Sequence, residues 1–210
     1  MKSILRMFAV TCCALLTLSL AAAETAAPAA FSGDDLVMDG LRVNAADAEI
    51  SAALTGREYT KQLDYEEGAT AKEWYVGNMV LTVDTEKGLV GATALDDTVT
   101  GPRGLKVGMT ANAVVKLFKV DGSTGTSSVF YSAGATGSDR LPQLPPCGYV
   151  QRDADGSISF VYMSPLEPYG DDGLSDPARF ITKGLDELVV KFDQNGNVSA
   201  FSWSRSYGLQ

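Results

Sequence analysis

The pentapeptide Asp39-Gly40-Leu41-Arg42-Val43 is matched 64 residues later by Arg103-Gly104-Leu105-Lys106-Val107, and this repeat decides the fold that the sequence predicts. Each copy leads into a short segment whose apolar residues recur at helical spacing. These residues are Ala46, Ile50, Ala53 and Leu54 after the first copy, and Val114, Leu117 and Phe118 after the second. Thr110 stands where a helix N-cap is expected. We expect a short helix after each copy, and a core of the second half formed by Leu105, Val107, Val114, Leu117 and Phe118.

Runs rich in aromatic and β-branched residues follow each helical segment, and many are separated by turns of Asp, Asn and Gly. These runs predict strands at 72–76, 79–84 and 89–95, and at 129–131, 148–152, 157–163, 188–192 and 198–203. In the last run, Val198, Ala200 and Ser202 alternate with Ser199, Phe201 and Trp203, which predicts one solvated and one packed face. The sequence therefore predicts an α+β fold: tandem repeats of a short helical segment packed on an antiparallel β-sheet.

The first 23 residues have the three parts of a secretory signal peptide. Lys2 and Arg6 give a positive start, residues 7–20 carry no charge, and Ala21-Ala22-Ala23 offers small residues for cleavage. A membrane anchor is the alternative. The uncharged stretch extends from residue 7 to residue 23, and its 17 residues lie at the lower edge of the length that spans a bilayer. We expect cleavage, and a bacterial protein that is secreted or resides in the periplasm or cell envelope.

Composition divides the chain further. We expect residues 1–23 to be the signal peptide, 24–35 a flexible lead-in, 36–98 the first α+β repeat, and 99–210 the second repeat with a polar insertion at 164–184. Removal of Lys2 and Arg6 leaves 15 basic and 26 acidic residues, a net charge of −11. Such a surface repels nucleic acid phosphates and anionic lipid headgroups, so we expect neither as a partner. We also expect no membrane span after cleavage, because no second apolar stretch is long enough.

The residue types of the chain limit its chemistry. Histidine is absent, so a Ser-His-Asp or Cys-His arrangement is impossible. Cys147 is the one cysteine outside the signal, and we expect it to be a small apolar residue near a strand start. The acid pairs 66–67, 96–97 and 171–172 and the Asp- and Gly-rich turns 153–156 and 193–197 fit solvated loops and hairpins better than glycosidase or calcium sites. No catalytic residue, metal site or cofactor is predicted.

The segment Gly104 to Thr110, Gly-Leu-Lys-Val-Gly-Met-Thr, with the helix after it, resembles the opening of repeats in the β-lactamase-inhibitor-protein-like group, which also includes small outer-membrane-assembly lipoproteins. The resemblance covers residues 36–56 and 97–118. In the first copy, Asn44 replaces the second glycine and Ala46 replaces the capping hydroxyl. The resemblance implies a tandem fold and a non-catalytic, protein-binding habit. It does not imply inhibition of β-lactamase.

The leading hypothesis is an exported, non-enzymatic protein-binding module that acts on an unidentified extracellular or envelope protein. The alternatives are a carboxylate-dependent hydrolase of cell-wall or dietary glycans and a structural envelope component. Tryptophan and tyrosine are favoured at binding hot spots. The candidate binding residues on or near the predicted strands are Trp74, Tyr75, Tyr149, Tyr162, Trp203 and Tyr207.

Overall fold

A computed structural model describes residues 28–63, 70–118, 129–132, 147–152, 156–167 and 184–208. The predicted signal peptide, residues 24–27 of the lead-in and most of the 164–184 insertion lie outside these ranges. Two of the predicted acid pairs, 66–67 and 171–172, and most of the 153–156 turn lie outside them as well.

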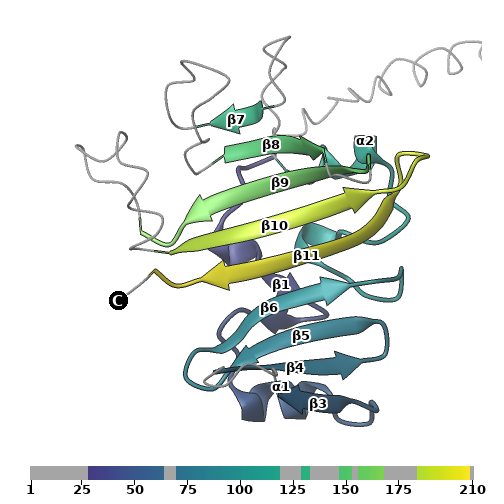
Figure 1. Cartoon of the computed structure of the whole chain (residues 1–210). Coiled ribbons are helices and arrows are strands. Elements are labelled where there is room, and N and C mark those ends of the chain that lie inside the picture. Colours follow the sequence, from purple (N-terminus) through teal and green to yellow (C-terminus); the bar gives the residue numbers. More distant parts are fainter. Residues whose placement is uncertain are drawn as a thin grey trace, which may run out of the picture.

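In the described ranges, nine antiparallel strands form one sheet (Figure 1). Its order is β3-β4-β5-β6-β11-β10-β9-β8-β7. The strands are β3 (Thr60–Leu63), β4 (Ala71–Val76), β5 (Met79–Asp84), β6 (Gly88–Ala94), β7 (Val129–Ser132), β8 (Cys147–Arg152), β9 (Ile158–Pro165), β10 (Leu185–Phe192) and β11 (Val198–Ser206). A separate two-stranded sheet pairs β1 (Val37–Met38) with β2 (Leu41–Arg42).

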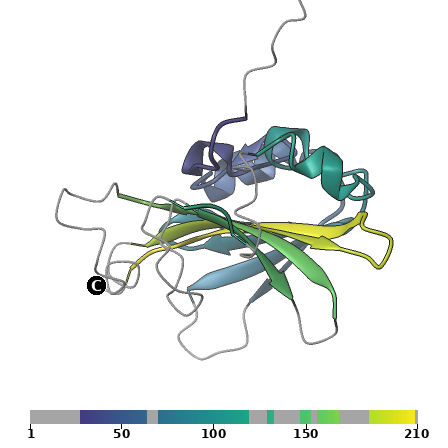
Figure 2. The ribbon, with the colours of Figure 1, turned by 90° about the horizontal axis from the view of Figure 1, so that it is seen from above.

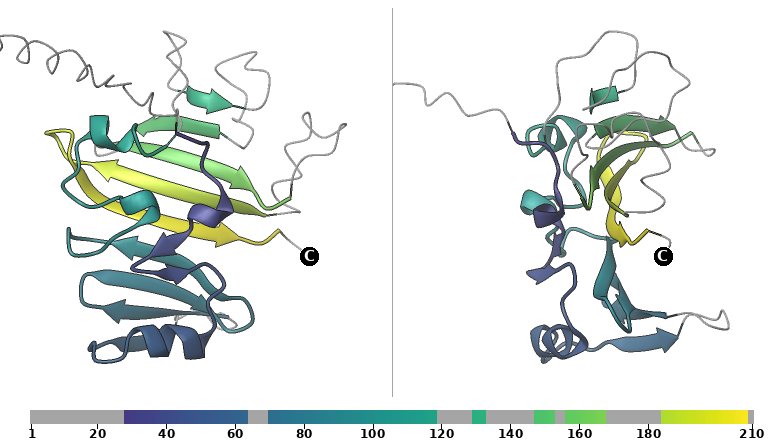
Figure 3. Two further views of the ribbon diagram at one scale, coloured as in Figure 1. Left: turned by 180° about the vertical axis from the view of Figure 1, so that it is seen from behind. Right: turned by 90° about the vertical axis from the view of Figure 1, so that its left-hand side faces the viewer.

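The helical elements are short and lie together on one side of the large sheet (Figures 2 and 3). They are the helices α1 (Asp47–Ala53) and α2 (Ala111–Val114) and the 3₁₀ turns η1 (Gly33–Asp35) and η2 (Pro102–Gly104). With β1 and β2 they form what we call the covering layer. The Thr110 hydroxyl oxygen accepts a hydrogen bond from the N–H of Ala113 at 3.3 Å, which confirms the predicted cap of α2.

The predicted fold class is wrong, because the protein is mostly β and is not built of helix-plus-sheet tandem repeats. Strand β6 of the first half pairs directly with β11 of the second, so the strands of both halves belong to one sheet. The helices have only seven and four residues. The two pentapeptides share a positive φ at their first two positions, 48° and 84° at Asp39 and Gly40 and 52° and 81° at Arg103 and Gly104. They differ at the next two positions, because Leu41 and Arg42 form β2 whereas Leu105 and Lys106 lie in no strand.

A single hydrophobic core lies between the sheet and the covering layer. One row of side chains, in register across six strands, forms its floor: Trp74, Leu81, Ala92, Trp203, Leu188 and Tyr162. All six are at most 3% exposed. Because the row crosses the β6–β11 junction without a break, the two halves share one core and stabilise each other by burying the same apolar surface.

Of the five residues predicted to form the core of the second half, three are fully buried, and they belong to the core that both halves share. Leu105, Val114 and Phe118 are fully buried, and Val107 and Leu117 are partly buried against them. The ring of Phe118 contacts that of Tyr162 at a centroid distance of 4.9 Å, which attaches the end of the α2 region to the floor of the core.

The predicted alternation in β11 is correct at its end and wrong at its start. Phe201 and Trp203 are buried, and Ser202 lies on the opposite face. However, the register with β10 shifts near Phe192, so Val198 is buried as well and Ser199 is exposed. A β-bulge of this kind moves one residue out of the alternation.

Candidate functional site

The face of the sheet that points away from the covering layer, here called the outer face, carries no described helix (Figure 3, right). Its central row crosses six strands from β3 to β10, and every member is exposed or partly exposed. We call this row the open patch; it consists of Thr60, Tyr75, Val80, Thr93, Ser202 and Val189. The patch contains no charged side chain. Its most exposed large residue is Tyr75, 40% exposed, whose hydroxyl donates to the carboxylate of Glu73.

Beyond β10 the outer face is less accessible, since Val161 and Cys147 are 1% and 0% exposed. Glu187 lies in the same row as Cys147, with Met163 between them. Burial raises the pKa of Glu187 above its ordinary value. Burial, and then the charge of Glu187, raise the pKa of the Cys147 thiol to about 12. The thiol therefore stays protonated at neutral pH, which leaves it a weak nucleophile and agrees with its predicted role as a small buried residue at a strand start.

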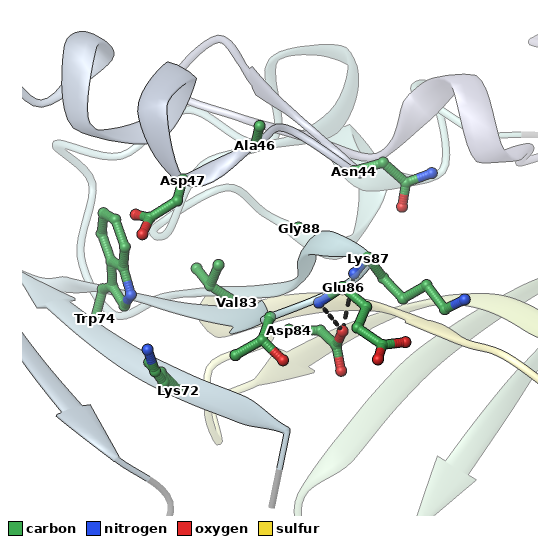
Figure 4. A pocket seen from close by; sticks show the side chains of 11 residues that line it. Asn44, Ala46, Asp47, Lys72, Trp74, Val83, Asp84, Glu86, Lys87 and Gly88 are labelled. Carbon is green, nitrogen blue, oxygen red and sulfur yellow. Dashed lines mark hydrogen bonds between the residues drawn. The ribbon is translucent and has the colours of Figure 1, made fainter.

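A groove of about 360 Å³ opens on the other side of the sheet, where α1 meets the β4–β5–β6 strands (Figure 4). Asn44, Ala46 and Asp47 line it from the covering layer. From the sheet side it is lined by Lys72, Trp74, Val83, Asp84, Thr85, Glu86, Lys87 and Gly88. The loop of residues 44–46 contacts the sheet through two backbone hydrogen bonds. The Asn44 N–H donates to the Leu89 carbonyl oxygen at 2.7 Å, and the Leu89 N–H donates to the Ala45 carbonyl oxygen at 2.9 Å.

Gly88 is required at the floor of this groove. Its φ is +75°, and a Cβ added there would lie 2.5 Å from the carbonyl oxygen of Ala45. Any other residue would push the loop of residues 44–46 away from the sheet. The close contact of the two layers at this point sets the width of the groove.

Trp74 forms one wall of the groove and is held rigidly. The ring of Tyr59 stacks on it at 5.5 Å, and the Lys61 ammonium lies 3.7 Å from the ring centroid. Its side chain is 1% exposed, yet its indole N–H has no hydrogen-bond partner among the described residues. An unsatisfied buried donor costs about 1–3 kcal/mol. The indole nitrogen lies on the ring edge that faces Lys72 and Val83 (Figure 4).

The carboxylates of the groove are largely occupied by contacts within the protein. Asp47 forms an ion pair with Lys61 at 3.1 Å. Asp84 accepts hydrogen bonds from the Thr70 hydroxyl at 2.7 Å and from the N–H groups of Glu86 and Lys87 at 2.8 Å each. Burial alone would raise the pKa of Asp84, but these hydrogen bonds outweigh it and hold the pKa below its ordinary value. Asp84 therefore remains ionised and is unsuited to act as a general acid.

Comparison with family models, curated proteins and solved structures finds no match to this chain. The resemblance to the β-lactamase-inhibitor-protein-like group therefore stays a prediction. No helix in the described ranges is long and apolar enough to cross a membrane. The same residues contain no group of three or more potential ligands that could hold a metal ion.

The six aromatic residues predicted to bind a partner do not lie together in the structure. Trp74, Tyr162 and Trp203 are buried in the core and form no exposed surface. Tyr75 lies in the open patch, and Tyr149 is partly exposed on β8 of the outer face. Tyr207, 40% exposed, follows β11 and donates a hydrogen bond to Asn44 at the rim of the groove.

Of the three acid pairs, only residues 96–97 lie in the described part of the chain. Asp96 accepts hydrogen bonds from the hydroxyl and the N–H of Thr98 and from the side-chain amide of Asn78. The Thr98 hydroxyl is the main cause of its lowered pKa. These contacts hold Asp96 in the turn after β6, which agrees with the predicted loop at 96–97.

Sequence reasoning missed the residues that build the groove, chiefly Lys72, Asp47 and Lys87. Each is an ordinary charged residue in its local context, and they come together only through the packing of α1 on the sheet. One usable signal was present. Lys72 and Trp74 are two residues apart in a predicted strand, which places an ammonium group and a large aromatic side chain on the same face.

Proposed function

We propose that this protein is an exported, non-enzymatic binding module that holds a partner protein of the cell envelope or medium against its open patch. The observation that carries the proposal is that the described covering layer lies on one face of the sheet (Figure 2), whereas the open patch on the other face is exposed or partly exposed. The open patch is a row of hydroxyl, aliphatic and tyrosine side chains on a rigid sheet. Such a surface loses little side-chain entropy when a partner covers it.

The charge of the protein supports a protein as the partner. A net charge of −11 in the mature chain opposes approach of nucleic acid. The open patch itself is uncharged, so a protein can dock there without burying an unpaired charge on this side. We expect the partner to be neutral or basic, because an acidic protein would be repelled.

The roles of the titratable groups support binding over catalysis. Asp84 and Asp96 are held by hydrogen bonds that lower their pKa values, and the Cys147 thiol has a raised pKa. Each of these shifts favours a stable charge state near pH 7, whereas a general acid or base works best when its pKa lies near the working pH.

The test is affinity capture from the secreted and envelope fractions of the source organism, with residues 24–210 as bait. Ser202→Arg places a long charged side chain in the middle of the open patch. The control Ala52→Arg adds the same side chain at an exposed position on α1. We expect one discrete partner that is retained by the wild type and by Ala52→Arg and is lost with Ser202→Arg.

Two results would overturn the proposal. One is capture that is unaffected by Ser202→Arg in a variant shown to be folded by circular dichroism. The other is turnover of peptidoglycan or another glycan by the same preparation, abolished when a single carboxylate is replaced.

A further inference from the structure

Glu187 is an unpaired carboxylate beside the open patch. It lies on the outer face of β10, two residues before Val189 of the patch, and is partly exposed. In the described structure its carboxylate has no hydrogen bond and no ion pair, and burial alone raises its pKa. Neither of its oxygens is fully buried, so a group on a second molecule can reach them.

The described neighbours of Glu187 on the outer face offer it no cation. Ser204 of β11 and Met163 of β9 lie opposite it in the two adjacent strands. Lys191 is on the same face of β10 but four residues further along, which is about 13 Å at the spacing of a strand. The carboxylate therefore has no counter-charge within the described part of the protein.

The row of the sheet that contains Glu187 runs beside the open patch, about 7 Å from it. From β4 to β10 this row consists of Glu73, Thr82, Gly91, Ser204 and Glu187. The carboxylate of Glu73 accepts a hydrogen bond from the Tyr75 hydroxyl. Of the two acids in this row, Glu187 is the one without a partner.

A protein that docks on the open patch also covers Glu187. The patch spans five strand spacings, so it is about 24 Å long, and it is about 7 Å wide. A stable protein interface covers about 800 Å² on each partner, which is more than this single row supplies. The partner therefore extends over the rows on either side. Burying the Glu187 carboxylate there without a counter-charge would strongly oppose binding.

We propose that the partner protein places a basic side chain, arginine or lysine, against Glu187 at the margin of the open patch. This inference rests on the proposed function and names the chemistry of the partner. A guanidinium or ammonium group can donate charge-assisted hydrogen bonds to the free carboxylate oxygens. Glu187 is already partly desolvated in the free protein, so less desolvation opposes this ion pair than opposes one between fully solvated groups.

The first measurement uses peptide probes and does not depend on capture of a partner. The glutamate side-chain carboxyl resonances of ¹³C-labelled residues 24–210 are followed by NMR during titration with acetyl-Val-Arg-Val-amide. The control peptide carries citrulline, a neutral isostere, in place of arginine. The Glu187 resonance is identified by its loss in Glu187→Gln, and Glu86, exposed in a turn, reports non-specific contact with the peptide.

We expect the Glu187 resonance to shift and saturate with the arginine peptide and not with the citrulline peptide. The pKa of Glu187 should be lower when the arginine peptide is bound, because a nearby cation stabilises the ionised carboxylate. The inference is overturned if the Glu187 resonance shows no saturable shift. It is also overturned if the citrulline peptide or the Glu86 resonance gives an equal response.

The second measurement is affinity capture with Glu187→Gln and Glu86→Gln as baits. Each substitution removes one negative charge, so an effect of net charge alone would be the same in both. We expect Glu187→Gln to bind the captured protein at least about tenfold more weakly, since it removes a charge-assisted hydrogen bond, and Glu86→Gln to bind it like the wild type. Urea unfolding of both baits shows that a loss of binding does not come from unfolding.

The proposed function and this inference fail in different ways. If the wild-type bait captures no partner, the proposed function is contradicted, and the peptide titration alone decides whether Glu187 accepts a basic side chain. If Glu187→Gln captures the same partner as strongly as the wild type does, this inference is overturned and the proposed function stands.

Discussion

At the scale of single residues, Arg103 does the most to hold the covering layer together. Its guanidinium makes a bidentate ion pair with Asp35, at 2.7 and 2.8 Å, and donates to the carbonyl oxygens of Ala29, Ala30 and Leu117. The guanidinium also lies over the ring of Phe118, 5.0 Å from its centroid. All five N–H donors of the side chain are thus used, and they tie the start of the described chain to the region of α2.

Replacing Arg103 with Lys should destabilise the fold by about 2 kcal/mol, because an ammonium group cannot reproduce a bidentate pair and three carbonyl contacts at once. Urea unfolding of residues 24–210 measures the effect. Arg57→Lys is the control, since the Arg57 side chain is 50% exposed and its pair with Asp39 is of the surface type. We expect a loss below about 0.5 kcal/mol there. Equal losses of unfolding free energy in the two variants would show that the contacts of Arg103 stabilise the fold no more than a surface ion pair does.

Glu187 gives a pH-dependent prediction at the same scale. Because burial raises its pKa in the folded protein, the ionised carboxylate costs stability at neutral pH. The cost is absent below the ordinary value of 4.5, where the side chain is protonated in both states, and it grows as the pH rises through the folded pKa. Glu187→Gln should therefore raise the urea midpoint at pH 7 and have a smaller effect at pH 4.

Glu86→Gln, in an exposed turn, is the control for this pair of measurements and should change the midpoint little at either pH. A lower midpoint of Glu187→Gln at pH 7 would contradict this prediction, because it would mean that a partner stabilises the ionised Glu187 carboxylate.

At the scale of elements, most strands and both helices were predictable because their signals are local. Residues 79–84 were predicted as a strand and form β5 without change, and the predicted strand 72–76 differs from β4 by one residue. β3 was missed, since two of its four residues are a lysine and a glutamine and it has no run of aromatic or β-branched residues. It forms because β4 offers it a free edge, with Lys61 opposite Trp74.

Phe118 tests the packing of the covering layer on the sheet. Phe118→Ala should lower the free energy of unfolding by about 3–5 kcal/mol, because the ring is fully buried between Phe31, Tyr162 and Arg103. Leu95→Ala, at a side chain 53% exposed, should cost less than about 0.5 kcal/mol. Chemical denaturation of both variants decides the point. A cost below about 1 kcal/mol for Phe118→Ala would contradict this packing.

At the scale of the whole molecule, the sequence did not reveal that both halves build one sheet. The hairpin turns specify which neighbouring strands pair, but the β6–β11 junction joins residues more than a hundred positions apart and carries no local signal. The same limit applies to the sites. The open patch is assembled from six strands and the groove from three separate stretches, so neither could be located before the strand order was known.

The proposed function requires that the open patch, on the face of the sheet opposite the covering layer, contacts a partner protein. Site-specific photo-crosslinking tests it most directly, with benzoyl-phenylalanine placed at Val80 in the open patch or at Ala52 on α1, in the native secreted and envelope fractions. We predict one discrete crosslinked protein from position 80 and none from position 52. Crosslinks from position 52 alone, or no crosslink from position 80 in a folded variant, would contradict the claim.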